Sequence, residues 1–152
     1  MGSRQTLPRQ WLIIDTQPAK ELWAAVRRLP RGSGVLLLRH LRGPEQRRLR
    51  RLAAIAGLTV LKEGRGEAAR VHDVGELRRA LLGRTPMILV SPIHRTSSHS
   101  DWRPLPRQRA AALARLAKRK AIALGGMNQK RYAKIAPLGF IGWAGIGAWS
   151  RR

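Results

Sequence analysis

The stretch AIALGGMNQKRYAKIAPLGFIGWAGIGAW, residues 121–149, decides the fold of this 152-residue chain. It opens with a short apolar run that predicts a buried strand and breaks at two adjacent glycines, Gly125 and Gly126. A helix-forming segment follows, and a second apolar run from Phe140 breaks into another glycine-rich turn. A strand, a helix and a second strand in this order are typical of one unit of a parallel α/β sheet.

The same alternation continues outward toward the N-terminus. Apolar runs that predict strands begin near residues 11, 34, 58 and 87, and helix-type spacing begins near residues 20, 44, 75 and 106. With the short segment ARVHD, residues 69–73, this makes about seven strands. No linker or repeat divides the pattern, so we expect a single domain over residues 10–150 and an α/β fold, a shortened TIM-type (β/α) barrel. A dinucleotide-binding sheet is disfavoured, because TQPAKEL after the first strand holds no glycine.

The chain is short for such a barrel, which typically needs about 250 residues. A strand-helix unit is missing between Glu63 and Met87. One helix is predicted there, in a region that usually holds two such units. Losing one strand of eight opens the sheet and exposes an edge. An exposed edge favours pairing with a second copy, so a homodimer is one expected assembly.

Three segments, in this order, resemble the thiamine-phosphate synthase family, including its TenI-type relatives. They are VSPIHRTSSHSDWRPL (90–105), AIALGGMN (121–128) and GFIGWAGIGAW (139–149), and LPRGSGVLLLRHL (29–41) is similar to the second strand of some members. The resemblance implies a transferase of thiamine biosynthesis that joins a hydroxymethylpyrimidine diphosphate to a thiazole phosphate with release of pyrophosphate. It also implies phosphorylated small molecules as substrates and Mg²⁺ as cofactor.

The resemblance also implies a set of site residues. Glycine lets backbone N–H groups approach an anion, and the positions matching the family's phosphate cradle are Gly125, Gly126, Gly145, Ile146 and Gly147. Strand-end and loop positions matching catalytic groups are Arg39, Ser91 and Thr96, and Ser98 and His99 match substrate-binding positions. The lysine that the family often carries in this loop is absent.

The family's acidic metal site is matched poorly. The segment LTVLKEGRGEAARVHDV, residues 58–74, lacks the expected Asn-Asp pair. Glu63 lies in roughly the right region, and Asp73 is the candidate metal ligand, without a partner at a suitable spacing. Two hypotheses stay open: a shortened active synthase, and a TenI-type or degenerate barrel that keeps the phosphate site without synthase activity.

The charge adds a third hypothesis. The formal net charge of +23 predicts salt-sensitive attraction to polyanions, as in a basic nucleic-acid-binding protein that uses the barrel as a scaffold. Arginine is spread over several segments, which favours an ordinary solvated surface over a dedicated nucleic-acid site. No apolar run reaches the roughly 18 residues of a membrane span, and the N-terminus lacks a secretory pattern, so we expect a cytoplasmic protein without membrane contacts.

Overall fold

The computed structural model describes residues 6–15, 20–64, 66–96 and 101–146. Within them the strands are β1 (Gln10–Ile14), β2 (Gly34–Leu37), β3 (Thr59–Lys62), β4 (Ala68–Val71), β5 (Met87–Val90), β6 (Ala121–Leu124) and β7 (Gly142–Gly145). The helices are α1 (Lys20–Arg28), α2 (Gly43–Ala56), α3 (Val74–Leu82), α4 (Arg107–Leu116) and α5 (Gln129–Ile135), followed by the 3-10 turn η1 (Ala136–Leu138).

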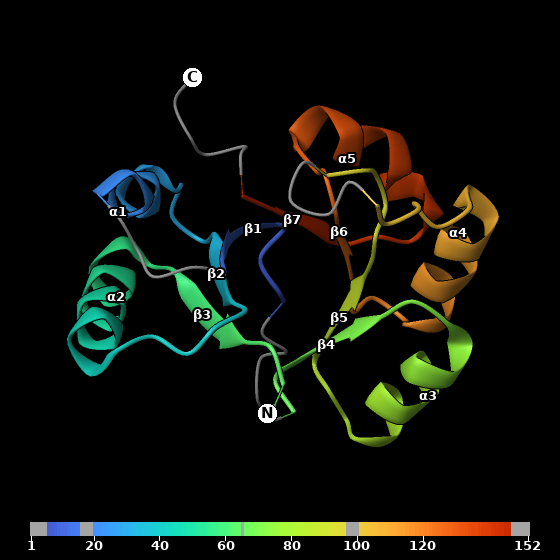
Figure 1. Ribbon diagram of the computed structural model, residues 1–152, viewed down its shortest axis with the longest axis horizontal. Helices are drawn as coiled ribbons and strands as arrows, with labels where there is room; N and C mark the ends of the chain where they lie inside the picture. Colours follow the sequence, from blue (N-terminus) through green and yellow to red (C-terminus); the bar gives the residue numbers. More distant parts are fainter. Residues whose placement is uncertain (1–5, 16–19, 65, 97–100, 147–152) are drawn as a thin grey trace.

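All seven strands belong to one parallel sheet in the order β3-β2-β1-β7-β6-β5-β4. The sheet is nearly closed into a barrel, and the five helices surround it, with α1 and α2 on one side and α3, α4 and α5 on the other (Figure 1). This confirms the predicted shortened TIM-type barrel of about seven strands. Among the described helices, none is long and apolar enough to span a bilayer.

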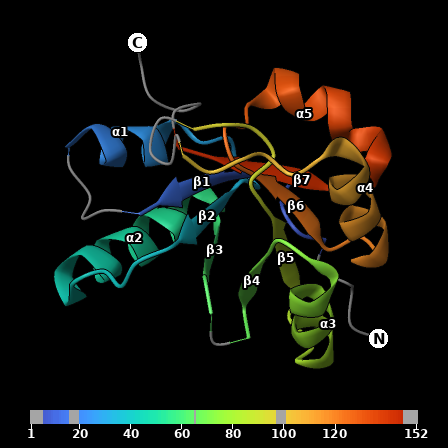
Figure 2. The same cartoon turned by 45° about the vertical axis from the view of Figure 1, so that its right-hand side comes forward.

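The barrel is open at one seam, between β3 and β4. Residues 63–67 connect these strands directly, without the intervening helix of a complete barrel (Figure 2). Two isolated bridges, from Glu63 and Gly64 to Ala68, replace a regular ladder here. The seam therefore lies in the region where the sequence predicts a lost unit.

A tryptophan fills the interior of the barrel. Trp11 is fully buried in a core that takes side chains from six of the strands, and its indole N–H donates to the carbonyl oxygen of Pro8 at 2.8 Å. A Cβ at Gly34, on the neighbouring β2, would lie 2.2 Å from the Trp11 ring. Glycine at this position is required by the close approach of the indole. Two further cores pack the outer face of the sheet against the helices.

Helix α4 is shorter than the sequence pattern predicts. The apolar spacing extends the helix from Pro106 to Lys120, whereas the structure ends it at Leu116. Lys118 and Arg119 adopt positive φ angles of 49° and 65°, which a right-handed helix cannot accommodate. The chain turns there to enter β6.

Candidate functional site at the barrel mouth

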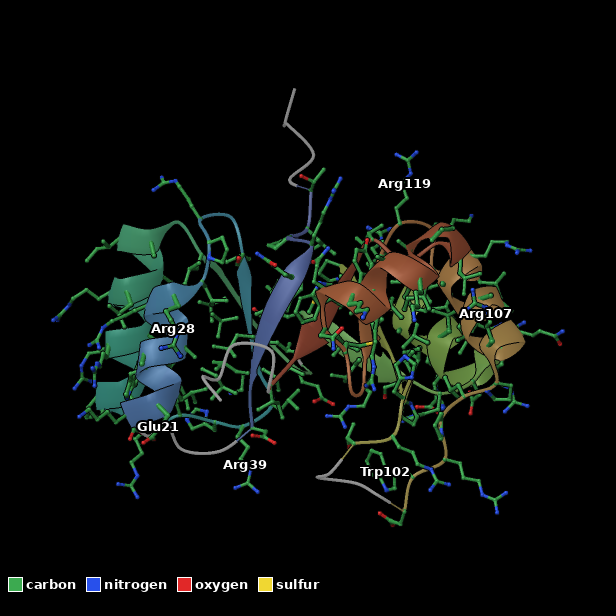
Figure 3. All side chains as sticks on the ribbon, turned by 90° about the horizontal axis from the view of Figure 1, so that it is seen from above. Glu21, Arg28, Arg39, Trp102, Arg107 and Arg119 are labelled. Carbon is green, nitrogen blue, oxygen red and sulfur yellow. The ribbon has the colours of Figure 1, made fainter. Side chains whose placement is uncertain are left out.

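The carboxyl-terminal ends of the parallel strands meet at one end of the barrel, which we call the mouth. Active sites of barrels of this type lie at this end. Figure 3 shows Arg39, just beyond β2, and Trp102, in the loop after β5, at this end, with Arg119 at the opposite end. Arg39 is exposed there.

Two polar side chains face the inside of the mouth. They are Arg70, on β4, and Ser91, the residue after β5. Ala68 and Leu89 belong to the interior core, whereas Val71 and Val90 pack against the outer helices. Since side chains alternate along a strand, Arg70 and Ser91 share the interior face with Ala68 and Leu89.

Arg70 is held by an ion pair across the open seam. Its Nη2 lies 2.7 Å from Oε2 of Glu63, the residue after β3, and both side chains are roughly three-quarters buried. The pair joins the two edge strands at the mouth, where the regular ladder is missing. The carboxylate neutralises the guanidinium and fixes its orientation.

Two buried donors at the mouth have no hydrogen-bond partner within the described part of the chain. They are Nε of Arg70 and Oγ of Ser91, and the Ser91 residue is only 3% exposed. Buried polar groups in folded proteins are almost always hydrogen-bonded, so two such donors at the strand ends are candidates for contact with a ligand. Both groups donate, which suits an acceptor such as a phosphate oxygen.

The glycines after β6 are packed against the loop that follows β5. A Cβ at Gly126 would lie 2.9 Å from the carbonyl oxygen of Arg95, and one at Gly125 would lie 3.0 Å from the Ile93 nitrogen. The His94 N–H donates to the Gly125 carbonyl at 3.1 Å. These glycines therefore have a packing role, and they bring the β5 loop beside the predicted cradle.

The remaining sequence-predicted residues are placed as follows. Gly145, buried at the end of β7, would meet the Met127 carbonyl oxygen at 2.9 Å if it carried a Cβ, and Ile146 beyond it is 39% exposed. Thr96 is half-buried in the β5 loop. Ser98, His99 and Gly147 lie outside the described residues. The phosphate cradle thus stays a prediction.

Asp73, the candidate metal ligand, caps helix α3. Its Oδ1 accepts the Glu76 backbone N–H at 2.8 Å. This hydrogen bond, with smaller contributions from other neighbours, holds the pKa of the Asp73 carboxyl below its ordinary value. Glu63 is likewise committed to Arg70. In the described ranges no group of three or more His, Asp or Glu side chains could hold a metal ion. The Mg²⁺ site stays a prediction.

The capping role of Asp73 gives a pH-dependent prediction. Replacing Asp73 by alanine lowers the melting temperature at pH 7, because α3 loses an N-cap, whereas asparagine, an equally good cap, changes it little. Because the folded pKa is depressed, the stabilisation is present above the unfolded pKa and is lost as the pH falls through the folded value. Thermal unfolding from pH 7 to pH 2 should therefore show the wild type and the alanine variant converging in acid. A constant difference across this range would contradict the assignment.

Sequence reasoning overlooked Arg70 and His94. Arg70 stands between Ala69 and Val71 in a short strand, and a charged residue at that point of an apolar alternation was the available signal. Burial, with the charges of Arg131 and Lys134, lowers the pKa of His94, which favours the neutral form of this loop imidazole.

A separate cavity of about 330 Å³ lies away from the mouth. It opens beside the amino-terminal ends of β1 and β2 and is lined by Arg9, Gln10, Arg31, Gly32, Ser33 and Gln129. None of the sequence-predicted site residues contributes to it. Its two arginines nevertheless make it an alternative place for an anion.

The fold is similar to that of two solved structures. No protein-family model matches the chain, and no curated protein matches it. A thiamine phosphate pyrophosphorylase structure from Pyrococcus furiosus superposes with a TM-score of 0.72 at 14% identity, covering 92% of this chain and 86% of that one. A thiamine phosphate pyrophosphorylase from Bacteroides thetaiotaomicron gives a TM-score of 0.56 at 16% identity, covering 93% and 83%. The chain has a thiamine-phosphate-synthase-like fold.

Proposed function

We propose that the protein binds a phosphorylated small molecule, of the thiazole phosphate kind, at the barrel mouth. The observation that carries the proposal is the pair of buried donors without partners within the described residues, Arg70 Nε near the end of β4 and Ser91 Oγ just after the adjacent β5. The likeness in fold to two thiamine phosphate pyrophosphorylases supports the choice of ligand.

The mouth can recognise a phosphate through donors that are already in place. The Ser91 hydroxyl and the Arg70 Nε–H both donate to phosphate oxygens, and hydrogen bonds to a charged acceptor are about twice as strong as neutral ones. Glu63 holds the Arg70 side chain in position before the ligand arrives. Arg39, exposed at the same end, adds a positive charge that attracts the anion from solution.

The second candidate is the synthase reaction itself, the activity that the names of the two structural neighbours indicate. That reaction needs the charge on the departing pyrophosphate to be stabilised. Arg39 is a cation at this end of the barrel, whereas the charge of Arg70 is neutralised by Glu63. We favour phosphate binding without synthase turnover, as in a TenI-type or degenerate barrel, because Asp73 and Glu63 are engaged in structural contacts.

Two measurements separate these candidates. Isothermal titration with thiazole phosphate should show one site, whose dissociation constant changes less than about twofold when EDTA replaces Mg²⁺, since Glu63 is paired with Arg70 and Asp73 caps α3. An assay with both substrates and Mg²⁺ should yield no thiamine phosphate above the protein-free control. Product formed in proportion to protein concentration would favour the synthase, and absence of any binding would refute both candidates.

A further inference from the structure

Two loops lie side by side at the end of the barrel opposite the mouth. One is the α3–β5 connection, residues 83–86, and the other is the α4–β6 connection, residues 117–120. They are neighbours because β5 pairs with β6, and the Ile88 N–H donates to the Lys120 carbonyl at 2.9 Å. Figure 3 shows Arg119 at this end, away from Arg39 and Trp102 at the mouth.

These loops and the ends of the helices before them form a positively charged surface, which we call the α3–α4 basic surface. All of its members except the half-buried Lys120 are exposed, and they are Arg79, Arg84, Arg115, Lys118, Arg119 and Lys120. From residue 77 to the end of the sequence the only acidic residue is Asp101, in the loop at the mouth. The ion pairs found in the described ranges, Arg70 with Glu63 and His72 with Glu76, include no member of this surface, although the charge of Arg79 acts on Asp73 at the start of α3.

Three cationic residues of the α3–α4 basic surface have a left-handed backbone conformation. Arg84, Lys118 and Arg119 have φ angles of 55°, 49° and 65°, and among the described residues they are the non-glycine positions with positive φ. Glycine is the usual residue where a helix ends in this conformation. Strained backbone conformations are concentrated at functional sites, and here an arginine or a lysine occupies each of the three strained positions.

We propose that the α3–α4 basic surface binds the phosphate backbone of a nucleic acid. Four of its six cations are arginines, whose planar guanidinium groups match phosphate geometry in pairs of hydrogen bonds. Two adjacent loops can contact successive phosphates along one strand. The surface is separate from the mouth, so this binding does not depend on the small-molecule site.

An anionic membrane is the rival partner. Leu82 and Leu116 are 78% and 48% exposed at the ends of α3 and α4, and exposed apolar groups among cations suit a lipid surface. Single exposed leucines are common on soluble proteins, however, and two of them bury little apolar area in a bilayer. The charge pattern therefore favours a nucleic acid.

The test uses the full chain and a fluorescein-labelled 20-nucleotide single-stranded RNA. The R84G/R119G variant removes two charges from the α3–α4 basic surface and relieves two positive φ angles, so it keeps the fold, which circular dichroism verifies. The matched control, R47Q/R51Q, removes two exposed charges from α2. Fluorescence anisotropy then gives the dissociation constant between 50 and 300 mM salt.

We expect R84G/R119G to weaken RNA binding about tenfold and the control to weaken it less than threefold. Each phosphate contact on a single strand contributes roughly 0.7 to the slope of log K against log salt. Losing two contacts should therefore make the slope shallower by about 1.4. Equal losses in both variants would show diffuse attraction and overturn the proposal. Sedimentation with phosphatidylglycerol vesicles but no RNA binding would overturn it in favour of a membrane.

Discussion

Replacing Trp11 by alanine is expected to lower the free energy of unfolding by about 3–5 kcal/mol, the range for deleting a large buried aromatic side chain. The indole fills the barrel interior, where it is fully buried and lies against the space that a Cβ of Gly34 would need. The neighbouring interior side chains are fixed to the strands and can collapse only partly into the resulting cavity. Chemical denaturation of both proteins measures the difference.

Trp102 provides the matched control, since it is 39% exposed in the loop at the mouth. Its replacement by alanine should change the free energy of unfolding by less than about 1 kcal/mol, as expected for a surface substitution. Equal losses for the two tryptophans would contradict the assignment of Trp11 as the interior plug. Gly34→Val should be at least as damaging as Trp11→Ala, because it adds bulk against the same ring.

Replacing Ser91 by alanine is expected to weaken the binding of thiazole phosphate about tenfold while leaving stability unchanged or raised. A hydrogen bond to a charged group contributes about 1.5–3 kcal/mol, which accounts for at least that loss of affinity. The Ser91 hydroxyl has no partner within the described residues, so removing it deletes an unsatisfied buried group rather than a bond. Titration calorimetry and thermal unfolding of the same sample separate the two effects.

Ser33 is the control, because it is a second buried serine whose hydroxyl, unlike that of Ser91, has a hydrogen-bond partner. Its Oγ accepts the Gln10 side-chain N–H at 3.0 Å at the other end of the barrel. Ser33→Ala should therefore lower stability and leave phosphate binding at the mouth unchanged. If Ser91→Ala instead destabilises the protein without affecting binding, the hydroxyl has an ordinary structural role.

The sequence was sufficient for the architecture because the strands are short apolar runs separated by clear helix and turn signals. The missing unit could be located between Glu63 and Met87 from spacing alone, and the seam lies there. The premature end of α4 could not be predicted. Lys118 and Arg119 are good helix formers, and only the turn into β6 forces them into a left-handed conformation.

The candidate site was less predictable than the fold. The glycine positions carried the resemblance, but glycine alone does not distinguish a ligand-facing turn from one packed by a neighbouring loop, as at Gly125 and Gly126. Asp73 illustrates the same limit, since an acidic residue before a helix is equally typical of an N-cap. Arg70 could be assigned to the mouth only from the alternation of β4, which places it on the same interior face as Ser91.

A crystal structure of the protein soaked with thiazole phosphate tests the central claim most directly. We expect a phosphate group in the mouth, with oxygens about 3 Å from both Ser91 Oγ and Arg70 Nε, and with the ion pair between Arg70 and Glu63 intact. The contradictory result is a mouth in which ordered waters satisfy both donors while the phosphate binds only in the cavity beside Arg9 and Arg31.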